Sequence, residues 1–166
     1  MQEIKRFYVY CSPIGALRVV IESGAVSCIA LAPEPCAVSE PCALWAKVRD
    51  ELDEYFGGKR KVFTFPIAPQ GTAFQLAVWR ELCNIAYGEI ATYGQIAARI
   101  GMSGAARAVG MACNRNPLLL AQPCHRVVGA GGKLTGFAVG VDRKRFLLEL
   151  EMDNSFGEGR DAVLVK

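Results

Sequence analysis

The segment TYGQIAARIGMSGAARAVGMACNRNPLLLAQPCHRVV, residues 92–128, sets the architecture of the second half of this chain. It begins with Thr92-Tyr93-Gly94-Gln95, in which a Thr and a Gln three residues apart form the capping box that starts a helix. Gly101-Met102-Ser103-Gly104 predicts a turn, with its serine as the N-cap of a second helix over residues 105–114. Asn116-Pro117 ends that helix, because proline cannot continue it. Two short helices joined by a glycine-containing turn predict a helix-turn-helix.

The second of these helices consists mostly of small residues. Arg107 is the only long polar side chain between Ala105 and Ala112. A helix that reads base edges in the major groove carries several Asn, Gln, Arg or Lys side chains, so a sequence-specific regulator is disfavoured. Small residues allow close backbone approach, which favours shape-driven binding, in the minor groove, through Ala106, Arg107, Ala108 and Gly110. The alternative is a tightly packed buried helix with Arg107 at its exposed edge.

The charge of the chain is concentrated around the same segment. Residues 1–70 contain eight basic and eight acidic side chains, whereas residues 71–151 contain nine basic and five acidic ones. No acidic residue lies between Glu89 and Asp142, and the basic residues there are Arg99, Arg107, Arg115, Arg126 and Lys133. An ordinary solvated face mixes both signs, so this stretch favours a surface that faces a polyanion such as nucleic acid.

A reactive thiol is indicated by Pro123-Cys124-His125-Arg126, which follows the apolar run 118–121. A nucleophilic Cys needs a nearby base or positive charge, and His125 is the single His of the chain. Neighbours on an extended strand point to opposite sides, so a relay from Cys124 to His125 requires a turn or an intervening water. Glu151 is a candidate for orienting the imidazole, on a helix from about Asp142 whose inward side chains include Phe146, Leu147 and Leu150. The alternative is that Cys124 and His125 are ordinary buried core residues.

The first half of the chain predicts a small α+β unit that contains no candidate catalytic residues. Its β-branched and aromatic runs predict strands, and these lie at residues 7–10, 17–21, 26–31 and 63–65. Between them, apolar residues from Trp45 to Phe56 recur at helical spacing, and Gly57-Gly58 ends that helix. The uncharged stretch 66–71 reads as a linker, followed by a capping box at Thr72-Ala73-Phe74-Gln75. We therefore predict a structural domain at 1–68, a binding and reactive domain at 69–151 and a tail at 152–166.

Composition excludes several classes of protein. No apolar stretch is long enough to cross a membrane, and residues 1–15 lack the apolar region of a signal peptide. Seven Cys without a CxxC pair argue against a disulfide framework and for a reducing compartment. With one His, a His-based metal site is excluded, and no metal is expected. These observations predict a cytoplasmic protein, or a nuclear one in a eukaryote.

The sequence resembles the O6-alkylguanine-DNA alkyltransferases through Pro123-Cys124-His125-Arg126-Val127. Further segments follow in the family's order and approximate spacing, and these are 71–75, 87–89, 92–97, 106–110, 116–117, 135–136 and 143–148. The resemblance is dense over residues 71–151 and weaker over 1–70, where it rests on Ser12-Pro13-Ile14-Gly15 and the helix end at 51–60. It implies a ribonuclease H-like N-terminal domain and a mainly helical C-terminal domain that carries the helix-turn-helix and the reactive Cys.

The resemblance also implies a reaction and a role for each site residue. Cys124 would accept the alkyl group of an O6-alkylguanine, or of an O4-alkylthymine, flipped out of double-stranded DNA, in a single turnover. His125 would act as a general base through a water, and Glu151 would orient its imidazole. Asn116 would hold the turn that bears the active site. Tyr93 would protonate the leaving guanine, and Arg107 would fill the gap left by the extruded base. The implied contacts to substrate or DNA also include Arg126, Val127, Thr135, Gly136 and Phe137. The implied protein is a monomer that needs no soluble cofactor and no membrane.

Three residues depart from the family pattern. Phe137 stands where many members have Tyr, which removes one hydroxyl, and Val139 stands where Gly is common. Both changes predict that bulky adducts react poorly relative to methyl. Gln122 replaces an apolar residue before Pro123, with no predicted consequence.

Two alternatives belong to other classes of function, a non-catalytic binding protein and a thiol hydrolase. A non-catalytic protein that binds alkylated bases and recruits repair factors is disfavoured by Cys124, since related non-catalytic proteins carry Trp there. A thiol hydrolase would turn over repeatedly on acyl or peptide substrates.

Overall fold

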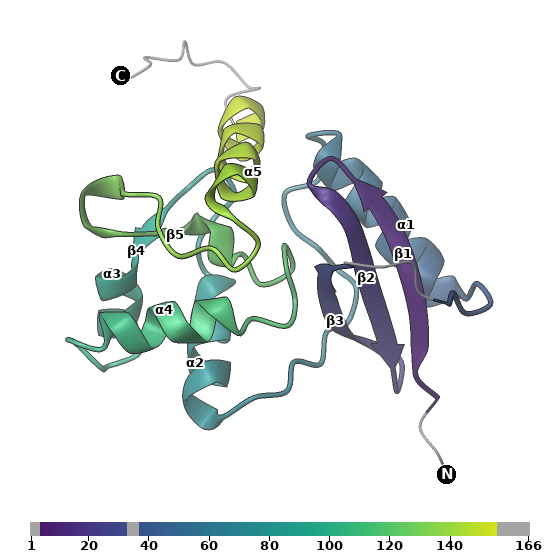
Figure 1. Cartoon of the computed structure of the whole chain (residues 1–166), viewed down its shortest axis with the longest axis horizontal. Coiled ribbons are helices and arrows are strands. Elements are labelled where there is room, and N and C mark those ends of the chain that lie inside the picture. The colour runs from purple at the N-terminus through teal and green to yellow at the C-terminus, as the bar shows by residue number, and fades with distance from the viewer. Residues whose placement is uncertain (1–3, 33–36, 156–166) are drawn as a thin grey trace.

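The computed structural model describes residues 4–32 and 37–155, and its first part is a three-stranded antiparallel sheet (Figure 1). The strands β1 (Arg6–Ser12), β2 (Gly15–Glu22) and β3 (Ala25–Leu31) lie in the order β1-β2-β3. Gly15, with φ of 117°, makes the first turn between them possible, because this conformation strains residues with a Cβ. The three strands that were predicted in this region are confirmed.

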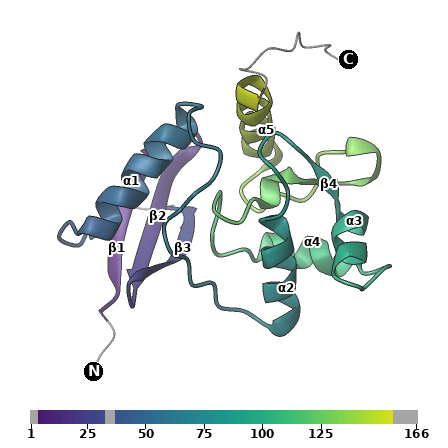
Figure 2. The same cartoon turned by 180° about the vertical axis from the view of Figure 1, so that it is seen from behind.

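Helix α1 (Ala43–Phe56) covers one face of the sheet, as Figures 1 and 2 show from opposite sides. The Cys42 side chain caps it by accepting a hydrogen bond from the Trp45 backbone N–H at 3.4 Å, and it ends at Gly57 as predicted. The rings of Tyr8 and Trp45 stack with centroids 4.6 Å apart. The Tyr10 hydroxyl donates to Asp53 at 2.7 Å, so both tyrosines of β1 attach the sheet to α1.

The second part is helical and contains α2 (Ala73–Leu82), α3 (Tyr93–Arg99) and α4 (Ala106–Asn114). Both predicted capping boxes are present at the starts of α2 and α3. The predicted Ser103 cap is wrong, because α4 starts at Ala106 after Ala105, and no side chain caps it. Trp79 of α2 is buried and donates its indole N–H to the Ala112 carbonyl of α4 at 2.8 Å.

The two parts are joined by hydrogen bonds along the outer edge of β3. The Val26 N–H donates to the Pro66 carbonyl at 2.9 Å, and the Ile29 N–H donates to the Pro117 carbonyl at 2.8 Å. The predicted strand at 63–65 is absent, and an isolated bridge forms at Ile67 instead. The physical reason is that the Glu51 carboxylate takes the backbone N–H of Thr64, at 2.7 Å, away from sheet pairing.

The chain closes with short elements and one long helix. β4 (Ala91–Thr92) pairs in parallel with β5 (Val127–Val128), which follows the single 3-10 turn η1 (Cys124–Arg126). A second 3-10 turn, η2 (Ala130–Gly132), precedes α5 (Val141–Ser155). The architecture is thus mixed α and β. Within the described residues, no helix has the length and apolarity needed to span a membrane.

Helix α5 corrects two predictions. It continues to Ser155, four residues past the boundary predicted at 151, because its last turn packs against glycines of both parts. A Cβ on Gly58 would clash with the Asn154 side chain, and one on Gly88 would meet Ser155 at 2.6 Å. Phe146 is exposed rather than inward, since Lys144 and Glu151 occupy the buried face. The rest of the predicted tail, 156–166, lies outside the described residues.

Candidate active site

Cys124 is the first residue of the turn η1 and is 3% exposed. The adjacent apolar run packs into the core at Leu118, Leu119 and Leu120, which anchors the segment that delivers it. Asn116 holds this segment in place: its Nδ2 donates to the Gln122 carbonyl at 2.7 Å and to Cys124 Sγ at 3.2 Å. The 3-10 turn is the local bend that a relay between Cys124 and His125 was predicted to require.

A buried carboxylate lies beside the single His of the chain. His125 Nε2 and Glu151 Oε1 are 2.7 Å apart, and the two side chains are 1% and 0% exposed, respectively. The Tyr55 hydroxyl donates to the same Oε1 at 2.7 Å. The Gly88 N–H donates to Oε2 at 3.3 Å. Because the carboxylate accepts from His125, we assign the proton to Nε2 and leave Nδ1 as an unprotonated acceptor.

Arg126 neutralises this carboxylate. Its Nε donates to Glu151 Oε2 at 2.8 Å and its Nη2 to Oε1 at 3.0 Å, which is a two-point contact. Its Nη1 donates to the Ile85 carbonyl at 2.6 Å, and its guanidinium lies 5.7 Å from the centre of the Tyr87 ring. Arg126 is 6% exposed, and its charge is balanced by the buried Glu151. Its predicted contact with substrate or DNA stays a prediction.

The environment shifts the pKa of each member of this group. Burial raises the pKa of the Cys124 thiol, although the hydrogen bond from Asn116 acts in the opposite direction. Burial lowers the pKa of His125 despite its hydrogen bond to Glu151, so the ring is neutral at pH 7. Burial alone would raise the pKa of Glu151, but His125 and Arg126 outweigh it and hold this pKa well below its ordinary value. The arrangement is therefore a protonated thiol, a neutral imidazole and an ionised carboxylate.

His125 Nδ1 has no hydrogen-bond partner within residues 4–32 and 37–155. It is a buried acceptor that faces no protein donor, adjacent in sequence to the Cys124 thiol. A neutral imidazole with one free nitrogen can take up a proton, which is what a thiol must lose to become a nucleophile.

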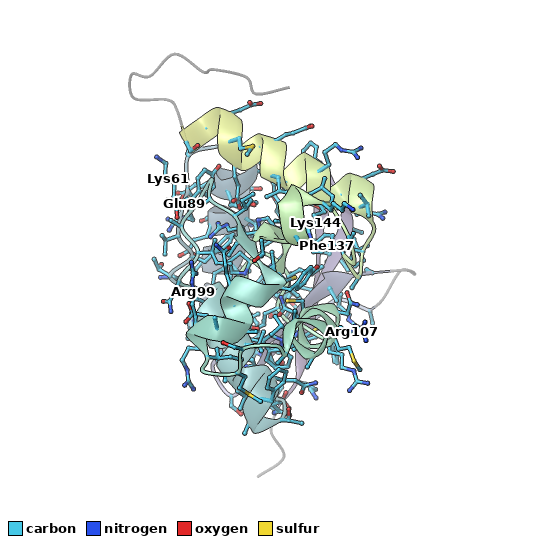
Figure 3. All side chains as sticks on the ribbon, turned by 90° about the vertical axis from the view of Figure 1, so that its left-hand side faces the viewer. Lys61, Glu89, Arg99, Arg107, Phe137 and Lys144 are labelled. Carbon is cyan, nitrogen blue, oxygen red and sulfur yellow. The ribbon has the colours of Figure 1, made fainter. Side chains whose placement is uncertain are left out.

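A buried Lys144 lies on the other side of the turn, and sequence reasoning missed it. Its Nζ donates to the Val127 carbonyl and, at 3.1 Å, to the Thr135 carbonyl. It also lies 5.7 Å from the centre of the Tyr93 ring and 5.8 Å from that of Phe137, which Figure 3 shows beside it. Burial lowers the pKa of Lys144. Lys144 shares one helix face with Leu147, Leu148 and Glu151, but this spacing alone does not indicate that a Lys is buried.

A cavity of about 460 Å³ opens between α3, α4 and the loop before α5. It contains six of the predicted substrate or DNA residues: Tyr93, Ala106, Arg107, Gly110, Thr135 and Gly136. α4 passes close to Tyr93 at Gly110, where a Cβ would lie 3.7 Å from the ring, an ordinary van der Waals distance. The Tyr93 hydroxyl donates to the Thr135 carbonyl at 3.0 Å, and burial raises the pKa of Tyr93 to about 12.

The remaining predicted contacts lie elsewhere. Ala108 is exposed on the other side of α4, beside Met111 and Arg115. Val127 is fully buried in the core and is not among the residues that line the cavity, so its contact with substrate stays a prediction. Phe137 is partly buried against the core. Arg107 is exposed and projects at the edge of the molecule in Figure 3.

Sequence reasoning missed several residues that complete the site. Tyr55 and Gly88 bind Glu151, and Tyr55 belongs to the first half of the chain, to which no chemistry was assigned. The apolar helical spacing of Tyr55 predicted its burial but contained no signal for its hydroxyl partner. In the part of the chain that the structure describes, no three His, Cys, Asp or Glu side chains group as a metal site.

Comparisons with known proteins identify similar chains. The family described as 6-O-methylguanine DNA methyltransferase, DNA binding domain, matches residues 73–153. A methylated-DNA–protein-cysteine methyltransferase of Methanosarcina mazei is 56% identical over 108 residues, which are 65% of this chain and 68% of that protein. The Haemophilus influenzae protein of the same name is 40% identical over 149 residues, which are 86% of this chain and 83% of that protein.

The fold is also similar to a solved structure. The crystal structure of Mycobacterium tuberculosis OGT in complex with DNA superposes with a TM-score of 0.83 at 40% sequence identity, and the match covers 89% of this chain and 93% of that chain. The alignments with three Methanosarcina relatives span 65% to 68% of the length of those proteins.

Proposed function

This chain belongs to the methylated-DNA–protein-cysteine methyltransferase family, and we propose that it repairs O6-alkylguanine in double-stranded DNA by transferring the alkyl group to its own Cys124. O4-alkylthymine is a second substrate. The observation that carries this proposal is the buried arrangement of Cys124, His125 and Glu151, with Asn116 holding the thiol at 3.2 Å. The thioether product is stable, so each molecule reacts once and no soluble cofactor is needed.

The chemistry follows from the protonation states. His125 Nδ1 accepts the thiol proton through a water, and Glu151, which Arg126 holds in place, stabilises the imidazolium that forms. The thiolate attacks the alkyl carbon, so an S–C bond forms while the C–O bond to guanine breaks. The electron pair passes to the guanine ring, and Tyr93 supplies the proton that the ring takes up. The phenol of Tyr93, whose pKa burial raises to about 12, is protonated at neutral pH and so has a proton to donate.

DNA would dock on α3 and α4, which we interpret as the helix-turn-helix of the domain. Its cavity, lined by Tyr93, Ala106, Gly110 and Thr135, would receive the extruded base. The exposed Arg107 would fill the gap left in the base stack. Ala108 would lie against the backbone, because a small side chain allows close approach.

The finer organisation is part of the same proposal. Residues 1–68 form a ribonuclease H-like structural domain, and residues 69–151 form the DNA-binding and alkyl-acceptor domain, whose last helix continues to Ser155. The protein acts as a monomer in the cytoplasm, or in the nucleus of a eukaryote.

Mass spectrometry after reaction with duplex DNA containing O6-methylguanine tests this proposal. We expect one methyl group per protein, located on the peptide that contains Cys124, and unmodified guanine in the DNA. Binding to methylated DNA without methyl transfer would instead support the non-catalytic recognition protein. Cys124→Ser retaining full transfer would refute the nucleophile assignment.

A further inference from the structure

We call residues 135–139 the pocket wall, because the segment begins with Thr135 and Gly136, which line the cavity, and both of its ends accept hydrogen bonds from side chains of α5. At the first end, the Thr135 carbonyl accepts hydrogen bonds from Tyr93 Oη at 3.0 Å and Lys144 Nζ at 3.1 Å. At the second end, the Val139 carbonyl accepts from Arg143 Nη1 at 2.8 Å. The wall is therefore held by side chains of two consecutive basic residues of one helix, and Arg143 supplies the side-chain hydrogen bond at the end that bears Val139.

Arg143 makes a second contact, with the first part of the chain. Its Nε donates to the Ile14 carbonyl at 2.7 Å, in the turn between β1 and β2. That turn is well fixed: the Ser12 hydroxyl donates to the Gly15 carbonyl at 2.6 Å, and Ile14 is 5% exposed. The Ile14 carbonyl is thus a rigid acceptor that belongs to the N-terminal sheet.

We propose that Arg143 is a positioning residue that ties the Val139 end of the pocket wall to the N-terminal sheet and so limits the size of the alkyl group that reacts. This inference rests on the proposed alkyl transfer. It also assigns a role in substrate selection to the Ser12-Pro13-Ile14-Gly15 turn, which the reaction itself does not use.

The chemistry of the side chain explains why Arg is needed there. A planar guanidinium presents several N–H groups in fixed directions, so it can donate to two carbonyls of different segments at once. A Lys has one ammonium on a flexible stem and no such fixed geometry. Arg145 is a matched control on the same turn of α5, because it is exposed and pairs only with Asp142 of its own helix, at 3.5 Å.

The test compares Arg143→Ala, Arg143→Lys and Arg145→Ala with the unmodified protein in two measurements. The first is the single-turnover rate on oligonucleotides that contain O6-methylguanine or O6-benzylguanine. Loss of two hydrogen bonds should raise the benzyl-to-methyl rate ratio of Arg143→Ala by about three- to tenfold, with Arg143→Lys in between and Arg145→Ala unchanged. The second is amide hydrogen exchange of residues 135–140, which should accelerate in Arg143→Ala only.

Each outcome has a distinct meaning. An unchanged rate ratio in Arg143→Ala, or equal losses of both rates from general destabilisation, would overturn the positioning role. Faster exchange in Arg145→Ala to the same extent would overturn it as well. If the unmodified protein transfers neither group, the proposed function fails, whereas the exchange measurement still reports whether Arg143 holds the wall.

Discussion

Glu151→Gln should destabilise the fold and slow alkyl transfer together. The wild-type carboxylate accepts from Tyr55, His125, Gly88 and two nitrogens of Arg126, and its side chain is fully buried. The substitution removes the charge that balances Arg126 and replaces one acceptor oxygen by an NH₂ group that faces other donors. A buried cation without a partner is the main cost.

The magnitude follows from that cost. Removing one partner of a buried ion pair typically costs about 3–5 kcal/mol. For a chain of this size, 1 kcal/mol corresponds to roughly 2–4 °C in Tm, so Tm should fall by about 6–20 °C. The pKa of Glu151 lies below its value in the unfolded chain, so its stabilisation is present above that ordinary value, about 4.3, and is lost as pH falls through the lower folded pKa. The difference between the two proteins should therefore shrink in acid.

Urea unfolding at pH 7 and at pH 4, with Glu149→Gln as the control, measures this effect. Glu149 lies on the same helix and is exposed, so its substitution should change the free energy of unfolding by less than about 0.5 kcal/mol. Single-turnover transfer should also slow in Glu151→Gln, because the imidazole loses its orienting carboxylate. Equal unfolding free energies for the two variants would refute the interpretation of Glu151 as the centre of the network.

Three further predictions concern the reaction. Arg107→Ala should slow repair of duplex DNA about tenfold or more but leave single-stranded substrate less affected, because unpairing costs a few kcal/mol; equal losses on both substrates would contradict this. Phe137→Tyr should speed methyl transfer, measured by quenched flow, by about two- to tenfold. The reason is that a hydrogen bond from the new hydroxyl to the base would contribute about 0.5–1.5 kcal/mol. The transfer rate should rise with pH toward and above the ordinary pKa of a thiol, because burial raises the pKa of Cys124; a flat pH profile would contradict a limiting thiol ionisation.

Local signals predicted several helix starts and stops correctly. The capping boxes at Thr72 and Thr92 and the stop at Gly57 were readable because each depends on hydrogen bonds within a few residues. The predicted Ser103 cap failed because α4 begins at Ala106, two residues later than a helix capped by Ser103 would begin. The roles of Cys124, His125 and Glu151 stay predictions, although the structure brings His125 and Glu151 together at 2.7 Å.

The buried charges could not be predicted from periodicity. Hydrophobic patterning assumes that charged side chains face water, so α5 was oriented with Phe146 inward. Its actual buried face contains Lys144 and Glu151, a rotation of roughly one residue, or about 100°. The carbonyls of Val127 in β5 and of Thr135 stabilise Lys144. Arg126 stabilises Glu151. All of these partners lie outside α5, so the pattern of the helix does not reveal them.

The pairing at the outer edge of β3 has a consequence for how such proteins can be divided or recombined. Residues 66–68 and 117–119 both hydrogen-bond to this strand, and the second segment leads from Asn116 to the acceptor Cys124. A cut after residue 68 would leave the backbone of the acceptor segment without its partners on β3. The N-terminal sheet thus supplies backbone hydrogen-bond partners to the reactive half. Exchanging the sheet between relatives should succeed only when the new sheet keeps these backbone groups at the positions of Val26 and Ile29.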